Sequence, residues 1–423
     1  MAQRVVLAYS GGLDTSVCIK WLQDHYDAEV ITLTIDLGAN DRDLGAIQAK
    51  AVSLGAKKAI QVDARSLFVN YFIFPALQAG AIYEEAYPLA TALGRPLIAK
   101  LLVDVAREEG AVAVAHGSTG KGNDQVRFDV SVSALAPELK VIAPVREWGM
   151  SREEEIEYAR EHDIPVPVTV ASPYSTDVNL WGRSIECGVL EDPWNEPPAE
   201  VYEWTTGPAE APAEPQYVEI GFEHGVPVSL GGEPLDGVSL IAKLNELGGA
   251  HGVGRIDHVE NRLVGIKSRE IYEAPAAMIL HAAHRALEGL TLTKDQARFK
   301  AKVATEYADL IYNGLWFSSL HQDLAAYVAS SERHVGGVVR VRLHKGTCQV
   351  VGRQSPKSLY SYQLATYDRA DKFDHRAAEG FIKLFGLPLR TQAAVQLLTG
   401  PEGQLSIMPP KVSEDAKKVE EGH

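Results

Sequence analysis

Residues 5–16 read V-V-L-A-Y-S-G-G-L-D-T-S, and this stretch decides the fold of the 423-residue chain. An apolar run typical of a buried strand comes first, and Gly11 and Gly12 then allow a tight turn that exposes backbone N–H groups. Polar residues 14–16 follow in what we predict to be the first turn of a helix. Exposed N–H groups at such a turn attract anions. The stretch therefore predicts a phosphate-binding loop at the C-terminal end of the first strand of a sheet.

Two common phosphate loops do not fit this spacing, because the chain has no G-x-x-x-x-G-K-[ST] and no G-x-G-x-x-G after a strand. The string S-G-G-L-D-T-S instead resembles the pyrophosphate-binding loop of the N-type ATP pyrophosphatases. That resemblance implies cleavage of ATP to AMP and pyrophosphate. The alternative is a glycine-rich strand-to-helix turn that binds no ligand.

Composition narrows the class of protein. A formal net charge of −15 argues against a broad nucleic-acid surface, so we expect small anions as ligands and no nucleic acid. The three cysteines are widely spaced and form no C-x-x-C pair, which favours free thiols in a reducing compartment. No apolar run reaches membrane-spanning length and no leader is apparent. We therefore expect a cytoplasmic protein with no membrane partner.

Apolar runs of strand type alternate with segments of helical period from residue 4 to about 165. This alternation predicts βαβ units, and hence an α/β fold with a doubly wound, mostly parallel sheet in a nucleotide-binding domain over residues 1–165. Ligands of such sheets bind beyond the C-terminal strand ends. The expected strands are 5–9, 30–37, 59–63, 111–116 and 141–145, and the expected helices are 15–26, 44–54, 96–109 and 152–162.

A second, α+β domain is expected over residues 166–370, with a Pro/Glu-rich crossing segment at 191–216. Residues 371–423 are expected to form a C-terminal oligomerisation helix and a polar tail. Within the second domain the pattern predicts hairpins at 217–230 and 338–351 and amphipathic helices at 238–247, 276–287 and 294–312; helical stretches follow at 376–384 and 391–398.

The second informative string is H-G-S-T-G-K-G-N-D-Q-V-R-F at residues 116–128, directly after a predicted buried strand. Three glycines leave its backbone accessible, while Lys121, Asp124 and Arg127 offer charges of both signs within a dozen residues. Such a mixture suits a zwitterionic substrate. The alternative is a polar loop in which Asn123 or Asp124 only caps the next helix.

Together with two further strings, G-V-L-E-D-P-W at 188–194 and H-G-V-G-R-I-D-H-V-E-N-R at 251–262, these motifs resemble the argininosuccinate synthase family. The similarity runs in order from about residue 4 to residue 390. It implies an AMP-forming ligase that joins citrulline to aspartate through a citrullyl-AMP intermediate, in arginine biosynthesis. It also implies a homotetramer built with help from the C-terminal helix.

The resemblance assigns roles to matching positions. Asp14, Lys121 and Asp124 are the expected catalytic residues, with Asp124 also a candidate base for the aspartate ammonium group. The expected ATP-binding residues are Ala8, Tyr9, Ser10, Gly11, Gly12, Leu13, Asp14, Thr15, Ser16, Ile35 and Gly117. Aspartate is expected at Thr119, Asn123 and Asp124, and citrulline at Tyr87, Asn123, Arg127, Ser175, Ser184, Glu260 and Tyr272.

We expect ATP with Mg²⁺ as the cofactor, the ion being carried by the nucleotide phosphates. His281 and His284 have a spacing seen in metal sites on helices, but without an evident cysteine or carboxylate partner this spacing is more often an accident of the helix face. We therefore assign no metal site to the protein itself.

Four residues depart from the pattern of the family close to the expected substrates: Ile35, Ala92, Arg183 and Glu270. They motivate an alternative, a divergent paralogue that adenylates another ureido or amide acceptor. A second alternative is a non-catalytic nucleotide-binding protein of the same fold. A tRNA-thiolating relative is disfavoured, because the chain lacks reactive cysteine pairs and basic surfaces.

Overall fold

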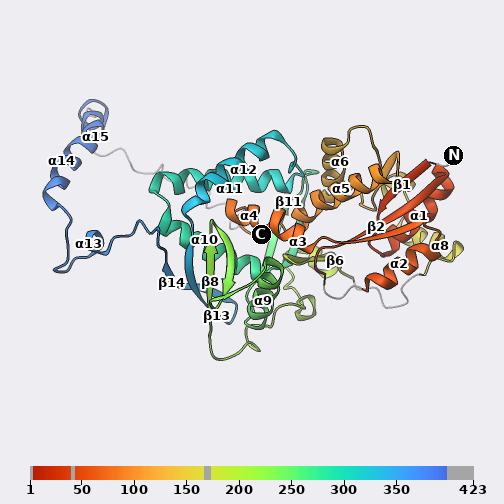
Figure 1. Cartoon of the computed structure of the whole chain (residues 1–423), viewed down its shortest axis with the longest axis horizontal. Helices are drawn as coiled ribbons and strands as arrows, with labels where there is room; N and C mark the ends of the chain where they lie inside the picture. The colour runs from red at the N-terminus through yellow and green to blue at the C-terminus, as the bar shows by residue number, and fades with distance from the viewer. Residues whose placement is uncertain (1–2, 40–42, 166–172, 398–423) are drawn as a thin grey trace, which may run out of the picture. The chain divides into compact units, whose positions relative to one another are not determined.

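The computed structural model describes residues 3–39, 43–165 and 173–397, in two compact units that comprise Met1–Leu359 and Tyr360–His423 (Figure 1). The first unit contains three sheets and the helices that cover them. The domain boundary that we predict near residue 165 falls inside this unit and stays a prediction.

A parallel sheet with strand order β3-β2-β1-β4-β5 confirms the predicted doubly wound fold. The chain moves from β1 outward through β2 to β3, and then crosses to the other side of β1 for β4 and β5. This topological switch point between β1 and β4 is where such sheets bind ligands. The strands are β1 (Gln3–Ala8), β2 (Ala28–Asp36), β3 (Lys58–Asp63), β4 (Ala113–Ala115) and β5 (Lys140–Ile142).

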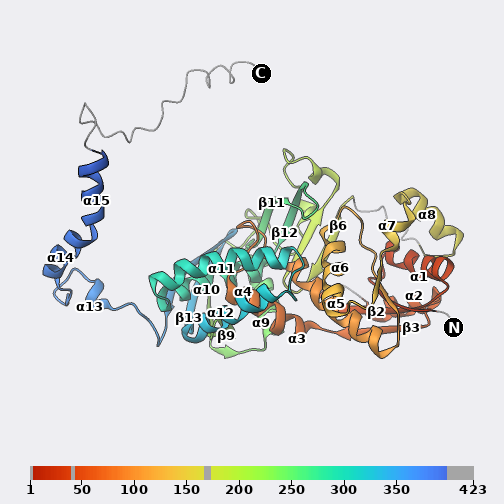
Figure 2. The ribbon, with the colours of Figure 1, turned by 90° about the horizontal axis from the view of Figure 1, so that it is seen from above.

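Helices cover both faces of this sheet, because both faces of its strands are apolar (Figure 2). Val5 and Leu7 pack with the helix α1 (Leu13–Tyr26), whereas Val6 packs with the helix α5 (Ala90–Glu108) on the other face. The remaining helices of this part are α2 (Leu44–Ser53), α3 (Arg65–Phe68), the π-helix η1 (Val69–Ile73), α4 (Phe74–Ala79), α6 (Asn123–Leu135), α7 (Pro144–Trp148) and α8 (Arg152–Glu161).

The start predicted for α5 at Pro96 is wrong, since the helix begins at Ala90 and contains Pro96. The phenol oxygen of Tyr87 accepts hydrogen bonds from the backbone N–H groups of Thr91 (2.9 Å) and Ala92 (3.3 Å). These bonds satisfy donors of the first turn, so the helix starts without a proline. Strand β5 also ends earlier than predicted, because Pro144 opens α7.

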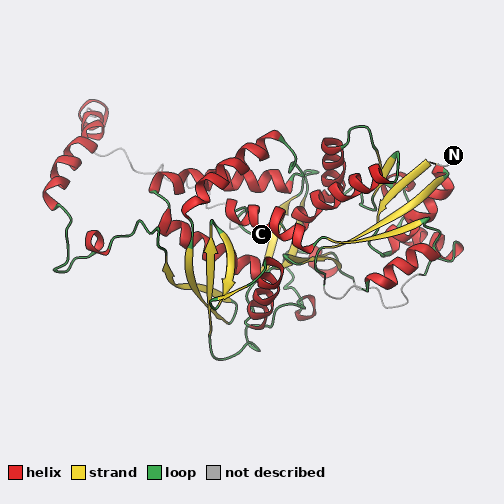
Figure 3. Cartoon of the chain, viewed as in Figure 1, coloured by secondary structure: helices red, strands yellow, loops and turns green. Residues whose placement is uncertain are grey.

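The rest of the first unit holds two antiparallel sheets, drawn in yellow in Figure 3. One has the order β10-β9-β8-β13-β14 and contains both predicted hairpins. The other has the order β11-β12-β7-β6. The strands are β6 (Ser175–Asn179), β7 (Gly182–Glu186), β8 (Gln216–Glu223), β9 (Val226–Leu230), β10 (Glu233–Pro234), β11 (Arg255–Asn261), β12 (Lys267–Glu273), β13 (Gly337–His344) and β14 (Thr347–Gln354).

Three helices of this region confirm predictions, namely α9 (Gly237–Ala250), α10 (Pro275–Thr291) and α11 (Lys294–Tyr312). They bury apolar stripes in one large core together with β8 and β13. The crossing segment at 191–216 consists of short 3₁₀ turns, loops and bends, and its last residue begins β8. The other elements are α12 (Ser319–Ser331) and the 3₁₀ turns η2 (Gly188–Glu191), η3 (Ala199–Val201) and η4 (Glu332–His334).

The second unit, blue in Figure 1, consists of short helices in its described part. They are α13 (Tyr362–Ala365), α14 (His375–Phe385), α15 (Leu387–Gln392) and the π-helix η5 (Ala393–Leu397). Large apolar side chains of α14 are exposed, including Phe381 (63%) and Leu384 (74%). The predicted polar tail from residue 398 lies outside the described residues. Among the helices that the structure describes, none has the length and apolar character needed to cross a membrane.

Candidate active site

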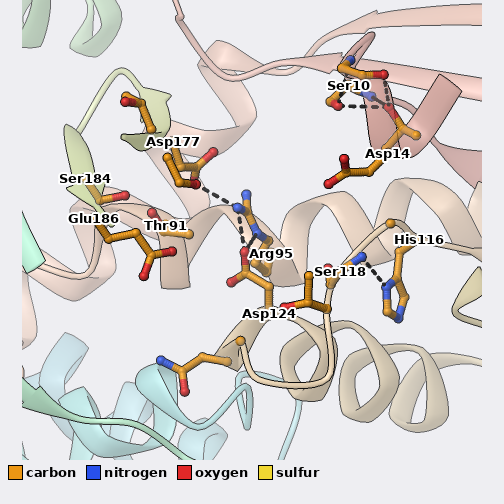
Figure 4. Close-up of a pocket in the computed structure, with 18 of the residues that line it drawn as sticks. Ser10, Asp14, Thr91, Arg95, His116, Ser118, Asp124, Asp177, Ser184 and Glu186 are labelled. Carbon is orange, nitrogen blue, oxygen red and sulfur yellow. Dashed lines mark hydrogen bonds and ion pairs between the residues drawn. The ribbon is translucent and has the colours of Figure 1, made fainter. Parts of the chain in front are cut away.

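A cavity of about 1220 Å³ opens in the first unit beside the C-terminal ends of β1 and β4. Its wall combines the loop after β1, the loop after β4 and the sheet β11-β12-β7-β6 (Figure 4). Every predicted site residue lines this cavity except Ser16 and Lys121. Segments far apart in the sequence therefore meet at the predicted edge of the parallel sheet.

The loop after β1 has the geometry of an anion cradle. Gly11 has a φ of +81°, and Gly12, the N-cap of α1, provides no side-chain cap for the N–H groups of the first turn. Ser16 is fully buried, and its hydroxyl donates to the Gly12 carbonyl oxygen (2.6 Å). Ser16 thus stabilises the loop from its buried side, which explains why the residue does not line the cavity.

The loop after β4 approaches the first loop closely. A Cβ atom on Gly117 would lie 2.9 Å from Cγ2 of Thr15, so only glycine fits at this crossing. His116 anchors the loop through Asp129 (2.9 Å). Gly122 is the N-cap of α6, so the alternative that Asn123 or Asp124 is the cap is wrong. Both residues lie in the first turn of α6 and line the cavity.

Lys121 is exposed and lies outside the cavity wall, on the tip of that loop. Arg152 lines the phosphate end instead, and the sequence pattern carries no signal for it. Its Nη1 donates to Asp14 Oδ1 (2.6 Å) and to Glu155 Oε2 (2.8 Å). Burial, and after it the charge of Asp14, raises the pKa of Glu155 to about 7. The phosphate end therefore already holds one fixed cation beside the loop.

One face of the sheet β11-β12-β7-β6 forms the opposite wall. Side chains alternate between faces along a strand, and the register pairs Ser184 with Tyr272 and with Asp177, and Ser175 with Glu186. Glu260 lies on the neighbouring strand β11, on the same face as Ile256, the partner of Tyr272. The cavity-lining residues of this face are Ser175, Asp177, Ser184, Glu186, Glu260, Glu270 and Tyr272.

Glu260 is the most enclosed carboxylate of this wall, at 3% exposure. It accepts hydrogen bonds from the hydroxyls of Tyr272 (2.5 Å) and Tyr312 (2.6 Å). Asn123 donates to Tyr312 (2.8 Å) and so joins the same network, while Tyr87 stacks on Tyr272 with ring centroids 4.3 Å apart. Tyr312, at the end of α11, is not among the predicted residues, because its helix reads as an ordinary core helix.

Asp124 is held by two arginines. Its Oδ1 accepts from Arg127 Nη1 (3.0 Å) and its Oδ2 from Arg95 Nε (2.9 Å). Burial alone would raise the pKa of Asp124, but the two guanidinium groups outweigh it and hold that pKa below its usual range. A carboxylate with a lowered pKa suits the binding of an ammonium group better than the removal of a proton.

Arg127 has one buried N–H donor that forms no hydrogen bond with the described residues. The side chain is 3% exposed, and Nε donates to the backbone oxygen of Tyr312 (2.9 Å). Its buried Nη2 has no hydrogen-bond partner among the described residues. Because a buried guanidinium group is normally fully paired, this orphan donor at the cavity wall favours an anionic ligand.

The four residues that depart from the family pattern lie in different surroundings in the structure. Arg183 is buried away from the cavity, paired with Glu273 (2.9 Å) and the Val201 carbonyl oxygen (2.6 Å), because its position in β7 places it on the other sheet face. Ala92 is fully buried within α5, while the neighbouring Thr91 lines the cavity. Ile35 and Glu270 line the cavity directly.

Glu270 shares Arg262 with Glu186, which contacts the same nitrogen of that guanidinium group. Burial, followed by the charges of Glu186 and Glu260, raises the pKa of Glu270 to about 8, because the divided charge of Arg262 compensates only in part. At neutral pH this end of the cavity therefore holds a protonated carboxyl group beside two carboxylates.

This raised pKa predicts a pH-dependent stability. The proton on Glu270 stabilises the fold fully below about pH 4.5, and the contribution is lost as the pH rises to about 8. The slope from one carboxyl group is at most about 1.4 kcal/mol per pH unit. Urea unfolding between about pH 5.5 and about pH 8.5 is expected to show a smaller slope for Glu270→Gln than for the wild type. The exposed control Glu153→Gln should keep the wild-type slope, and equal slopes for all three proteins would contradict the assignment.

His281 and His284 do not form a site together. Burial lowers the pKa of His281 to about 3, and its Nε2 has no partner among the described residues. His284 pairs with Glu332 (2.9 Å), and these two and Glu288 have ligand atoms within 4.8 Å of one another. The ammonium group of Lys300 contacts both carboxylates. The positive charge of this cluster is therefore supplied by the Lys300 ammonium group.

The chain matches the family models of the arginosuccinate synthase N-terminal HUP domain over residues 4–165 and the arginosuccinate synthase C-terminal domain over residues 174–392. It is 63% identical over 394 residues to an argininosuccinate synthase of Symbiobacterium thermophilum, covering 93% of this chain and 98% of that protein. An argininosuccinate synthase of Dehalococcoides mccartyi is 60% identical over 94% of this chain and 97% of its own length.

Among solved structures, a 4-thiouridine synthetase in complex with RNA and bound ATP is similar at 18% identity and a TM-score of 0.29. The match covers 38% of this chain and 41% of that chain, which is too little to bear on function.

Proposed function

The chain belongs to the argininosuccinate synthase family, and from this we propose that the cavity performs the ATP-dependent ligation of L-citrulline and L-aspartate to argininosuccinate. The reaction releases AMP and pyrophosphate and belongs to arginine biosynthesis. The observation that carries the proposal is the meeting, in one cavity, of a glycine-rich loop at a helix N-terminus with a wall of carboxylate, hydroxyl and guanidinium groups.

We assign the ATP triphosphate to the loop after β1, where N–H groups at the start of α1 face an anion and Gly117 lets the second loop close over it. Mg²⁺ enters as part of the substrate, bound to the phosphates. Ile35, at the end of β2, is the apolar residue placed for the adenine ring.

Citrulline is an α-amino acid and needs groups of both signs. We place its carboxylate at the unpaired Nη2 of Arg127 and its ammonium group near Glu260. Ser175 and Ser184 on the sheet face and Tyr87 and Tyr272 complete the acceptor end. Arg183 plays no part in this binding, because it lies on the far side of the sheet.

We place aspartate at the first turn of α6, with its ammonium group on Asp124 and its carboxylates near Thr119 and Asn123. The aspartate amine then lies between the two other substrates. Lys121 would reach them only by a movement of the loop that carries it.

The chemistry runs in two steps. The ureido oxygen of citrulline bonds to the α-phosphorus while the bond from that phosphorus to the bridging oxygen breaks, and the electron pair leaves with pyrophosphate. The aspartate ammonium group then loses one proton to solvent and its nitrogen bonds to the ureido carbon. AMP leaves with its bonding pair, and the nitrogen loses a second proton to solvent. No side-chain nucleophile is required, so the protein acts by orienting substrates and stabilising charge.

The test is pyrophosphate release from Mg-ATP, with citrulline and aspartate supplied together and singly, and with the product identified by mass. We expect release that depends on citrulline, and argininosuccinate only when both amino acids are present. Absence of citrulline-dependent release at millimolar substrate would sink the proposal. Release with another acceptor would favour a divergent paralogue, and ATP binding without turnover a non-catalytic protein.

We further propose that this protein works in the cytoplasm as a homotetramer without nucleic acid. The net charge of −15 and the exposed apolar face of α14 support these assignments. Changing Phe381 and Leu384 together to serine is expected to reduce the mass measured by light scattering to a smaller assembly. Changing the exposed Glu379 and Lys383 of the same helix to serine is the control. An unchanged mass for the apolar pair would contradict the role of α14.

A further inference from the structure

Arg95 lies on α5 in the middle of the cavity wall, and it is the residue that links the two predicted amino-acid sites. Its Nη2 lies 2.7 Å from Asp124 Oδ2 on α6 and 2.8 Å from Asp177 Oδ2 on β6. The Nε atom also donates to Asp124, at 2.9 Å. The acceptors belong to two different elements, so they fix the plane of the guanidinium group, and the Arg95 side chain is only 14% exposed.

The remaining nitrogen of Arg95 is available to a ligand. Within the described part of the chain Nη1 has no hydrogen-bond partner, although Arg95 lines the cavity. Figure 4 shows Arg95 with Asp124 and Asp177 on one side and the loop of Ser10 and Asp14 on the other. The guanidinium group thus stands between the anion cradle and the acceptor wall.

We propose that Arg95 is a catalytic residue that contacts the α-phosphate of ATP and stabilises the negative charge that develops there when the ureido oxygen attacks. This inference rests on the proposed function, which brings that phosphate between the cradle and the acceptor. As the new oxygen–phosphorus bond forms and the bond to the leaving pyrophosphate breaks, charge increases on oxygens next to the phosphorus. A fixed, permanently charged fork meets that charge without reorganising.

Asp177 acts as a positioning residue in this arrangement. Its side chain is 38% exposed and its carboxylate holds Nη2 of Arg95, so we assign to it the rotation of the guanidinium group. Asp177→Asn keeps the size and removes the charge. We expect a loss in kcat of about 3-fold to about 10-fold, with the KM values for ATP and citrulline unchanged.

The test measures citrulline-dependent pyrophosphate release in single turnovers without aspartate, which isolates the first step. Arg95→Ala is expected to slow this step about 10²-fold to 10³-fold, and Arg95→Lys at least about 10-fold, because lysine keeps the charge but loses the fork. The KM values for ATP and citrulline should stay within about 3-fold, since the interaction strengthens only in the transition state. Arg107→Ala is the matched control, an arginine of the same helix that is 53% exposed and pairs with Glu138.

Two results would overturn the inference. One is an unchanged rate for Arg95→Lys and Arg95→Ala, and the other is a rise in KM with kcat unchanged, which would make Arg95 an anchor for Asp124 and Asp177. If Arg95→Ala does not fold, as judged by its thermal midpoint, Arg95→Lys decides. Failure of the proposed function is distinguishable, because then the wild type itself releases no pyrophosphate in response to citrulline.

Discussion

Aspartate use is expected to fall about 10³-fold in kcat/KM when Asp124 is changed to alanine, while the Kd for Mg-ATP changes less than about 3-fold. The carboxylate of Asp124 faces Arg95 and Arg127, so its removal leaves two guanidinium groups where an ammonium group must bind. Repulsion between these cations and the substrate amine adds to the loss of the attractive partner. Steady-state kinetics with aspartate varied, and equilibrium binding of ATP, measure the two effects.

Asp124→Asn separates charge from packing, because it keeps the volume of the side chain. Asp104→Ala is the matched control on α5, where Asp104 pairs with Lys100 at the surface. Loss of a buried ion-pair partner destabilises proteins by about 3–5 kcal/mol, so thermal midpoints must be measured beside the rates. Equal losses in aspartate use and in ATP binding would contradict our assignment of Asp124.

Gly11→Val is expected to raise the Kd for Mg-ATP at least about 100-fold. Gly11 has a φ of +81°, and an added Cβ would lie 2.9 Å from Cγ1 of Ile47 on α2. Valine in this conformation is strained, and relieving the strain moves the N–H groups that form the anion cradle. Isothermal titration with Mg-ATP gives the Kd directly.

Gly110→Ala is the control for this prediction. Gly110 also has a positive φ, +63°, but among the described residues nothing lies within 4 Å of the place that an added Cβ would take. The change should therefore cost some stability and leave ATP binding unaltered. A Kd for Gly11→Val within about 3-fold of the wild-type value would show that the loop after β1 is not the phosphate site.

The parallel sheet could be predicted because each of its strands is a short apolar run followed by a helical period. β6, β7, β11 and β12 are absent from the prediction. Their sequences are rich in polar and charged residues, such as S-T-D-V-N at 175–179, and lack the continuous apolar pattern by which the strands of the parallel sheet are recognised. Pro96 misleads the prediction of α5 because the acceptor for its first-turn N–H groups is the phenol oxygen of Tyr87, and tyrosine is not a residue by which a helix start is recognised.

The site residues that motifs could reveal are those that lie together in the sequence, such as the loops at 10–16 and 116–128. Arg95, Arg152 and Tyr312 stand alone on helices. Only the fold brings the two arginines to the cavity wall and Tyr312 into hydrogen bonds with the wall residues Asn123 and Glu260. Arg183 shows the opposite error, because its place in the sequence suggests a role in the site that the fold does not give it. It departs from the family pattern next to Ser184, yet the alternation of the strand turns it to the other face.

Because side chains alternate between the two faces of β7, deletions and substitutions in this strand affect the acceptor site differently. Ser184 and Glu186 face the cavity, whereas Arg183 and Ile185, which alternate with them along the strand, are buried on the reverse side. A single-residue deletion within β7 would exchange the two sets, exposing an ionic network and an apolar residue to substrate. Point substitutions alter one contact at a time and leave the others in place. We expect lineages of this chain to vary here in residue type and to keep the length of the strand invariant.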